Sequence, residues 1–319
     1  MRTDWNSVSL DSLGVLRVRG ADVVSFLQGQ LSNDVALLSA ERSLLAGYHN
    51  PQGRVIALLR LLQPSPGEVL AILPRELAAA VALRLTKFIL RTKVKVADES
   101  ASWRVVGLIA PESPANPAPL LANRLPETLD GSAPVHESIA VRVGALPARW
   151  LILSSLAPAA SAAHPPAALS DWVLTELDTW QRLAVAAGEP EVYAATSEEF
   201  VAQMLNLDVL GAIAFDKGCY TGQEVIARAH YRGRVKRRLQ RFVTHTPLRL
   251  KPGDAGELAD GRAFKVVNAV PLADGGCEFL AVALVSADDS NASRSPREAQ
   301  RGAMAINAEP LALPYPLPP

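Results

Sequence analysis

The sequence predicts a mixed α and β fold that ends in a β-rich domain. Two observations carry this prediction. In the first part of the chain, short runs of alternating apolar and polar residues are followed by longer runs with helical periodicity. After Gly233, strand-like segments recur between Gly- and Asp-rich turns, which is typical of a small β domain.

The first element is a strand at residues 16–20, and the turn at 20–22 leads into a helix with Val23, Leu27 and Leu31 on one face. The periodicity predicts further strands and helices, and the Pro-rich stretches predict surface loops. Expected strands are 55–62, 69–73, 93–96, 103–109, 150–153, 237–243, 263–270 and 278–285; expected helices are 75–91 and one from Ala168 to the break at 188–190; expected loops are 111–134 and 158–166.

Composition limits the classes of function. A chain of 34.0 kDa with 49% hydrophobic residues can form two or three domains with real cores. The 32 basic and 32 acidic residues cancel, so electrostatic recognition of a partner must be local. The N-terminus lacks the apolar region of a signal peptide, and Arg60 interrupts an apolar stretch, so we expect a cytoplasmic protein with no membrane contact.

The stretch KGCYTGQE, residues 217–224, contains one of the two cysteines, Cys219. Thr221 and Glu224 have the spacing of a capping box, which predicts a helix from Thr221 that ends near a left-handed Gly233. A thiol ahead of a helix N-terminus and close to Lys217 is favoured as thiolate. Cys219 is therefore a candidate nucleophile or soft-metal ligand, with a buried structural thiol as the equal alternative, and Cys277 is expected to be structural.

A permanent metal centre is not expected. Two cysteines without a CxxC spacing cannot hold a zinc ion or an iron–sulfur cluster by themselves, and the five histidines show no HxxH or HExxH pairing. We also expect both thiols to be reduced, because a lone disulfide is unusual in a large protein that is not secreted.

A local run of basic residues follows Cys219, without an acidic residue among them. It could bind RNA phosphates or a small polyanion such as the glutamate tail of a folate, or it could be a solvated helix end and edge strand. Its members are Arg228, Arg232, Arg234, Lys236, Arg237, Arg238 and Arg241.

Together these motifs resemble the YgfZ family, folate-binding proteins related to the aminomethyltransferase, or T-protein, of the glycine cleavage system. The resemblance is carried first by residues 217–228 and 231–233. Further matching stretches are GAD at 20–22, FLQGQ at 26–30, SND at 32–34, NPQGR at 50–54, AGEP at 187–190, QMLNL at 203–207, EPL at 309–311 and PY at 314–315.

The resemblance implies an α+β fold of three domains in a clover-like ring around a central folate pocket, with a ferredoxin-like core and a C-terminal β-barrel domain. The implied boundaries are residues 1–48 with 150–232 for the folate-pocket domain, 49–149 for a second α+β domain, and 233–319 for the barrel. The pattern of the residues alone predicts only mixed α and β with a β-rich end.

The resemblance also implies a function: a tetrahydrofolate-binding accessory protein for iron–sulfur cluster assembly or repair. Its expected cofactor is tetrahydrofolate or a derivative. Its expected partners are iron–sulfur client enzymes, such as radical-SAM tRNA methylthiotransferases, or cluster-assembly proteins, with tRNA as a further partner. A monomer without autonomous catalytic activity is expected.

Site residues follow from the same resemblance. Cys219 and Lys217 match the signature's reactive thiol and its lysine, and Trp180 matches a folate-contacting tryptophan, since an indole suits stacking on a pterin. A second such tryptophan falls near Leu13 and is missing here. The remaining candidates for folate binding are Arg228, Asn33, Asp34, Asn50, Glu189, Gln223 and Glu224.

Two other functions stay open from the residues. The T-protein carries an aspartate pair after its Asn and Gly turn, and Ala57 and Leu58 stand at those positions here. Neither side chain can transfer a proton, which argues against an aminomethyltransferase. The third possibility is a direct RNA-binding module that uses the basic run at 228–241.

Overall fold

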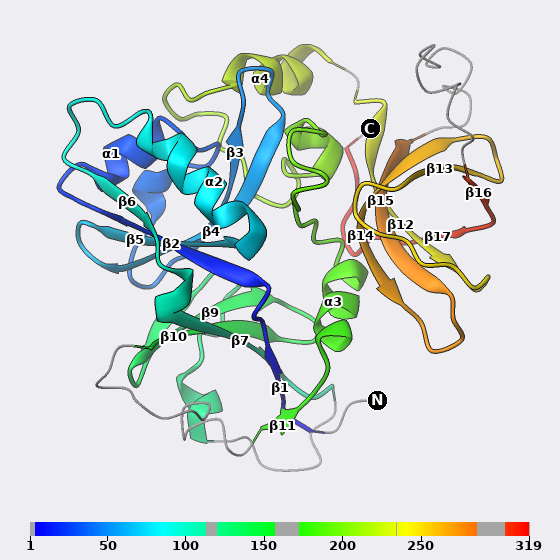
Figure 1. The fold of residues 1–319 in the computed structure, drawn as a ribbon, viewed down its shortest axis with the longest axis horizontal. Helices are drawn as coiled ribbons and strands as arrows, with labels where there is room; N and C mark the ends of the chain where they lie inside the picture. The colour runs from blue at the N-terminus through cyan, green and yellow to red at the C-terminus, as the bar shows by residue number, and fades with distance from the viewer. Residues whose placement is uncertain (1–3, 113–119, 157–171, 234, 286–303, 319) are drawn as a thin grey trace. The chain divides into compact units, whose positions relative to one another are not determined.

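The computed structural model describes residues 4–112, 120–156, 172–233, 235–285 and 304–318 (Figure 1). The described residues form three β-sheets and a small number of short helices. The chain divides into two compact units, of which the first contains two sheets and the second contains one. The first unit is Met1–Tyr48, Ala57–Trp180 and Asp216–Tyr220, and the second is His49–Ile56, Gln181–Phe215 and Thr221–Pro319.

One sheet of the first unit is built from strands that lie far apart in the sequence. Its order is β11-β1-β7-β10-β9-β8, and only β1 and β11 pair in parallel. Trp150 and Trp172 pack into the core on one face, together with Val106 and Leu108. The strands are β1 (Asn6–Ser9), β7 (Trp103–Ile109), β8 (Ser132–Val135), β9 (Ser138–Gly144), β10 (Arg149–Ser155) and β11 (Val173–Leu174).

The other sheet of this unit has the order β3-β4-β5-β2-β6. Its strand β4 is apolar along nearly its whole length because it is covered on both faces. The helix α2 packs against β2, β5 and β6. The strands are β2 (Leu13–Arg19), β3 (Leu44–His49), β4 (Val55–Ser65), β5 (Glu68–Pro74) and β6 (Lys95–Asp98), and the helices are α1 (Val23–Gln28), η1 (Val35–Leu37), α2 (Arg75–Thr86), η2 (Ser100–Ser102) and η3 (Leu120–Arg124).

The second unit contains the C-terminal sheet, with the order β16-β13-β14-β15-β12-β17. Every residue of β15 is buried, and the rings of Phe242 and Phe279 stack with centroids 5.5 Å apart in the core. The strands are β12 (Arg237–Thr244), β13 (Ala255–Leu258), β14 (Ala263–Pro271), β15 (Cys277–Leu284), β16 (Met304–Ile306) and β17 (Glu309–Leu311), and the helices are η6 (Ala202–Leu205) and α4 (Gln223–Arg232).

Most predicted strands are confirmed, including the long C-terminal ones, but several helices differ from the prediction. The helix expected to carry Val23, Leu27 and Leu31 on one face is α1, which ends at Gln28, before Leu31. The helix expected from Ala168 begins only at Leu177, as α3 (Leu177–Ala186). Trp172 is buried in a core and β11 pairs with β1. The residues just before α3 are therefore held by tertiary contacts and do not form helical turns. The helix expected at 75–91 ends at Thr86, because the next amide groups bond three residues back rather than four. The loop expected at 158–166 and part of the one at 111–134 lie outside the described residues.

The sheets divide the chain differently from the implied domain boundaries. The boundary at 48/49 falls inside β3, which belongs to the same sheet as β4, and the boundary at 149/150 cuts β10. The boundary at 232/233 coincides with the end of α4, but α4 belongs to the same compact unit as the C-terminal sheet. Within the described residues, no helix has the length and apolar character needed to cross a bilayer.

Candidate functional site

The loop that carries the cysteine is anchored by Lys217. Its ammonium donates hydrogen bonds to the main-chain carbonyl oxygens of Gln28 (2.8 Å), Leu31 (2.7 Å) and Asn33 (2.8 Å). An ammonium has three donors, and three carbonyls accept them here. Lys217 therefore fixes residues 216–220 to the segment that follows α1.

Burial changes the ionisation of this anchor. Burial lowers the pKa of Lys217 to about 8, although the Asp34 carboxylate acts in the opposite direction. The ammonium also lies 5.0 Å from the centroid of the Tyr220 ring, a cation–π contact. Burial raises the pKa of Tyr220 to about 12, so this phenol stays neutral at physiological pH. The anchor is a cation held by neutral oxygens and a neutral ring.

Cys219 is a free, exposed thiol on this anchored loop. Lys217 is bound two residues before it, and Tyr220, directly after it, is buried. A Cβ built on Gly218 meets no atom within 4 Å, so the backbone beside the thiol is open. The equal alternative, a buried structural cysteine, is wrong for Cys219. Cys277 is structural, as predicted: it is buried in the C-terminal core, and that burial raises the pKa of its thiol.

Asn33 and Asp34 hold the turn between α1 and η1. The Asn33 side chain donates to the carbonyl of Leu45 (2.7 Å) and accepts from the amide of Asp34 (2.8 Å). Asp34 caps η1 by accepting from Ala36 and also accepts from the Gln28 carboxamide (2.8 Å). These two candidate residues therefore shape the segment that accepts the Lys217 hydrogen bonds.

The predicted capping box at Thr221 is wrong. Helix α4 begins at Gln223, its N-cap is Gly222 with φ 83°, and no side chain caps it. A glycine takes this position because it accepts a positive φ and because the backbone is crowded there. A Cβ on Gly222 would lie 2.5 Å from the carbonyl oxygen of Asn50. The helix ends before Gly233 as expected, but Gly233 is extended rather than left-handed.

Asn50 organises the turn that lies against Gly222. Its side-chain oxygen accepts from the amides of Gln52 and Arg54, both at 3.0 Å, and its amide group donates to Glu198 (2.7 Å). Gly53, with φ 70°, closes this turn. As with Asn33, the side chain of Asn50 forms hydrogen bonds with the nearby backbone and stabilises a turn.

Trp180 packs on a sheet of the first unit. Gly107 on β7 leaves room for it, because a Cβ there would lie 2.5 Å from the indole ring. The guanidinium carbon of Arg149 on the adjacent β10 lies 5.2 Å from the ring centroid. The indole is nevertheless only half-buried, so part of its surface remains available to a ligand. Trp5 cannot replace the missing tryptophan near Leu13, because it packs against Trp150 and Trp172.

The other candidates occupy different positions in the second unit. Glu224 and Arg228 are exposed on α4, and Gln223 is half-buried at its first residue. Glu189 follows the left-handed Gly188 and is half-buried. The structure thus brings Asn33 and Asp34 of the first unit to Lys217, which precedes Cys219 by two residues. Three of the remaining candidates, Gln223, Glu224 and Arg228, lie together on α4 in the second unit.

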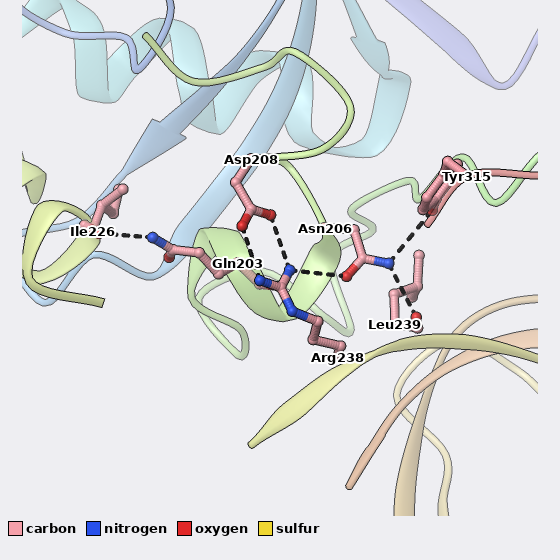
Figure 2. A network of polar contacts seen from close by, with 7 residues as sticks. All are labelled: Gln203, Asn206, Asp208, Ile226, Arg238, Leu239 and Tyr315. Carbon is pink, nitrogen blue, oxygen red and sulfur yellow. Dashed lines mark hydrogen bonds and ion pairs between the residues drawn. The ribbon is translucent and has the colours of Figure 1, made fainter. Parts of the chain in front are cut away.

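A buried polar network in the second unit joins Arg238 of the basic run to Asp208, which the sequence did not single out (Figure 2). Arg238 is 4% exposed and forms two parallel hydrogen bonds of 3.0 Å with the Asp208 carboxylate. It also contacts the carbonyl of Gln203 and the side chain of Asn206. Asn206 has a left-handed backbone and donates to the carbonyl of Leu239, which links η6 to β12.

The same network reaches α4 and the C-terminal tail (Figure 2). The Gln203 amide donates to the carbonyl of Ile226 on α4 (2.7 Å). The Tyr315 hydroxyl accepts from Asn206 (3.4 Å) and donates to the carbonyl of Gly188 (2.7 Å). The stretches at 203–207 and 314–315, which carry part of the family resemblance, therefore belong to one buried hydrogen-bond network.

The basic run is therefore only partly a surface feature. Arg238 is internal and Arg241 pairs with Glu278 at 2.7 Å, so neither offers a free charge to a partner. Arg228, Arg232 and Lys236 are exposed, Arg237 is half-buried, and Arg234 lies outside the described residues. Sequence alone could not separate these roles, because the pairing carboxylates are 30 and 37 residues away. Within the described parts of the chain, no three His, Cys, Asp or Glu side chains group as a metal site.

Comparison with solved structures defines the class of fold. The chain matches the crystal structure of the glycine cleavage system aminomethyltransferase T from Bartonella henselae with a TM-score of 0.68 over 89% of this chain and 79% of that one. The two sequences are 17% identical, so the likeness concerns the fold alone. The predicted α+β, aminomethyltransferase-type fold is confirmed.

Comparison with curated sequences gives the family. The tRNA-modifying protein YgfZ of Pectobacterium carotovorum subsp. carotovorum is 32% identical over 267 residues, which are 82% of this chain and 78% of that protein. The protein of the same name from Cronobacter sakazakii is 29% identical over 322 aligned positions, gaps included, which cover 97% of this chain and 93% of that protein. No protein-family model matches the chain. The chain belongs to the YgfZ family.

Proposed function

We propose that this chain acts in tRNA modification as a tetrahydrofolate-binding accessory protein that supports iron–sulfur enzymes, including those that thiolate tRNA. The observation that carries the proposal is the exposed Cys219 on a loop anchored by Lys217 in a chain of the YgfZ family. The name of the curated relatives supports the role in tRNA modification, and the folate and iron–sulfur parts rest on the resemblance of the motifs.

Cys219 is the residue proposed to contact the client. A single accessible thiolate can ligate an iron atom of a partner's cluster, and it supplies too few ligands to keep a cluster. Lys217 is the positioning residue, since it donates hydrogen bonds to three main-chain carbonyls at the end of α1 and just after it, and so holds the loop of Cys219 in place. The chemistry proposed for this site is transient ligation.

Within each unit taken by itself, individual residues have side chains that suit one part of a folate. Trp180 keeps some indole surface exposed after packing on Gly107, which suits stacking on a pterin. Arg228 is exposed and suits the carboxylates of a glutamate tail. Asn33, Asp34 and Asn50 contribute less, since their side chains hold turns. When bound, the folate would supply one-carbon chemistry or serve as a ligand only.

A catalytic aminomethyltransferase is the weaker alternative. Ala57 and Leu58, which stand at the positions of the T-protein's aspartate pair, are buried in β4 and carry no ionisable group. We therefore propose that the aminomethyltransferase-type fold is used here without autonomous catalysis, since fold and function can diverge.

The test of the folate proposal is a titration with tetrahydrofolate, followed by tryptophan fluorescence, in parallel with an assay for one-carbon transfer. Saturable binding without turnover is expected. Trp180→Ala should weaken binding by about tenfold, whereas Trp103→Ala, which removes another half-buried tryptophan, should not. Equal affinity of the Trp180→Ala and native proteins would contradict the role of Trp180, and turnover would favour a transferase.

Cys219 is tested by complementation with Cys219→Ser. Loss of client iron–sulfur enzyme activity, with folate binding retained, is the expected result. Because the side chain is exposed, this variant should fold normally. Full client activity in the variant would exclude Cys219 from the function, while leaving the folate proposal intact.

A further inference from the structure

Two residues of the last turn of α4 form an aromatic cluster with Phe215, which precedes the loop of Cys219, and the proposed function does not use this cluster. The rings of Phe215 and His230 stack with centroids 3.7 Å apart and an interplanar angle of 16°. Tyr231 meets both rings edge-on, with centroids 6.1 Å from Phe215 and 4.7 Å from His230. All three side chains belong to the second unit, and the contacts hold them as one group.

The group is exposed and lies beside positive charge. Tyr231 is 67% exposed, although a large aromatic ring is usually covered by its own protein. Arg232 is exposed on the same turn, and neither it nor Arg228 forms an ion pair with any other described residue. No acidic residue occurs between Arg228 and Arg241. The surface therefore combines open π-faces with uncompensated cations.

Unpaired RNA nucleotides have the chemistry that matches both features. A nucleobase stacks on an exposed aromatic ring, and the adjoining phosphate pairs with a guanidinium. An apolar protein partner would leave the arginine uncompensated, and a simple polyanion would leave Tyr231 without a contact. We propose that Phe215, His230, Tyr231 and Arg232 form a docking surface for unpaired nucleotides of an RNA.

This surface is smaller than the basic run predicted from sequence. Arg238 and Arg241 are withdrawn into ion pairs, so the contact covers a few nucleotides rather than a long strand. RNA as the occupant rests on the proposed role in tRNA modification, and the docking surface itself does not depend on folate. Base stacking favours loops over duplex, because paired bases hide their faces.

The test measures the affinity of the full-length protein for a fluorescent, unmodified tRNA transcript and for a single-stranded oligouridylate. Tyr231→Ala should weaken binding about 5- to 150-fold, and Tyr231→Phe, which keeps the ring, should bind like the native protein. Phe88→Ala is the matched control, because Phe88 is also exposed and follows a basic residue, Lys87, but lies just after α2 in the first unit.

The charge is tested separately. Arg232→Ala should weaken binding and lower the slope of log affinity against log salt by about one, whereas Arg249→Ala, an exposed arginine of the same unit, should leave the slope unchanged. Equal binding by Tyr231→Ala and native protein, an equal loss in Phe88→Ala, or equally good competition by duplex RNA would overturn the proposal. Tetrahydrofolate binding measured on the same variants separates this failure from a failure of the proposed function.

Discussion

Lys217 donates a hydrogen bond to the main-chain carbonyl of Asn33, 2.8 Å away in space and 184 residues away in sequence. This contact, with two more to Gln28 and Leu31, joins the loop of Cys219 to the turn after α1. A side chain that was predicted to act on the thiol by charge thus also has a positioning role, because it donates to three main-chain carbonyls.

Replacing Lys217 by Met should lower the free energy of unfolding by about 1–3 kcal/mol. Methionine keeps the aliphatic stem but leaves three carbonyls without their donor. Chemical denaturation of the native and variant proteins measures this difference. Lys87→Met is the control, because Lys87 is exposed at the end of α2 and should change stability by less than about 0.5 kcal/mol. A Lys217→Met variant as stable as the control would contradict the role of the anchor.

The same lysine predicts a pH dependence. Its pKa is lowered by burial to about 8, from an ordinary value of 10.5. Between pH 8 and 10.5 the unfolded chain binds more protons than the folded protein, so this group makes the free energy of unfolding rise with pH. Below pH 8 both states are protonated and its contribution is constant. Comparing native protein with Lys217→Met across this window isolates the effect, and a difference that does not grow with pH would refute it.

The regular elements were predictable because their signal is local. The apolar residues within 237–243 and 278–285 reflect burial within single strands, and β12 and β15 lie where these segments predict strands. The helix expected from Ala168 failed because β11 pairs with β1, a contact that no local window contains. The local pattern therefore predicts most helices and strands. The element that differs here does so because it pairs with a strand that is distant in the sequence.

The candidate site was predictable as a segment but not as a set of contacts. The motif at 217–224 located Cys219. The acceptors of Lys217 are main-chain oxygens, which every residue has, so the sequence does not indicate which residues accept its hydrogen bonds. Arg238 resembled its neighbours in the basic run, and only the spatial position of Asp208 makes it internal. The left-handed Asn206 left no distinctive signal beyond its motif.

Gly222→Ala should be destabilising through both conformation and contact. Gly222 has φ 83°, and an added Cβ would lie 2.5 Å from the carbonyl oxygen of Asn50. Gly211 has φ 67° with no atom within 4 Å of an added Cβ, so Gly211→Ala reports the conformational cost alone, about 1 kcal/mol. Urea unfolding should show a larger loss for Gly222→Ala. Equal losses would mean that the turn at Asn50 moves aside freely.

The two thiols should differ in reactivity in the folded protein. A thiol-specific chromogenic reagent should modify Cys219 rapidly, because it is exposed, and should reach Cys277 only on unfolding, because it is buried and its pKa is raised. Cys219→Ser should remove the rapid phase, and Cys277→Ser should leave it unchanged. A rapid phase that persists in Cys219→Ser would show that the C-terminal core opens readily.

Arg238→Met should be among the most destabilising single changes in the second unit. It leaves the Asp208 carboxylate buried without its partner, which costs about 3–5 kcal/mol. Lys265→Met breaks the more exposed ion pair with Glu199 and should cost less than about 1 kcal/mol. Adding Asp208→Leu to Arg238→Met should recover much of the loss, because no unpaired charge then remains. The free energies of unfolding of the native protein, the two single variants and the double variant test this. Equal losses for Arg238→Met and Lys265→Met would show that the ion pair of Arg238 does not stabilise the buried network in Figure 2.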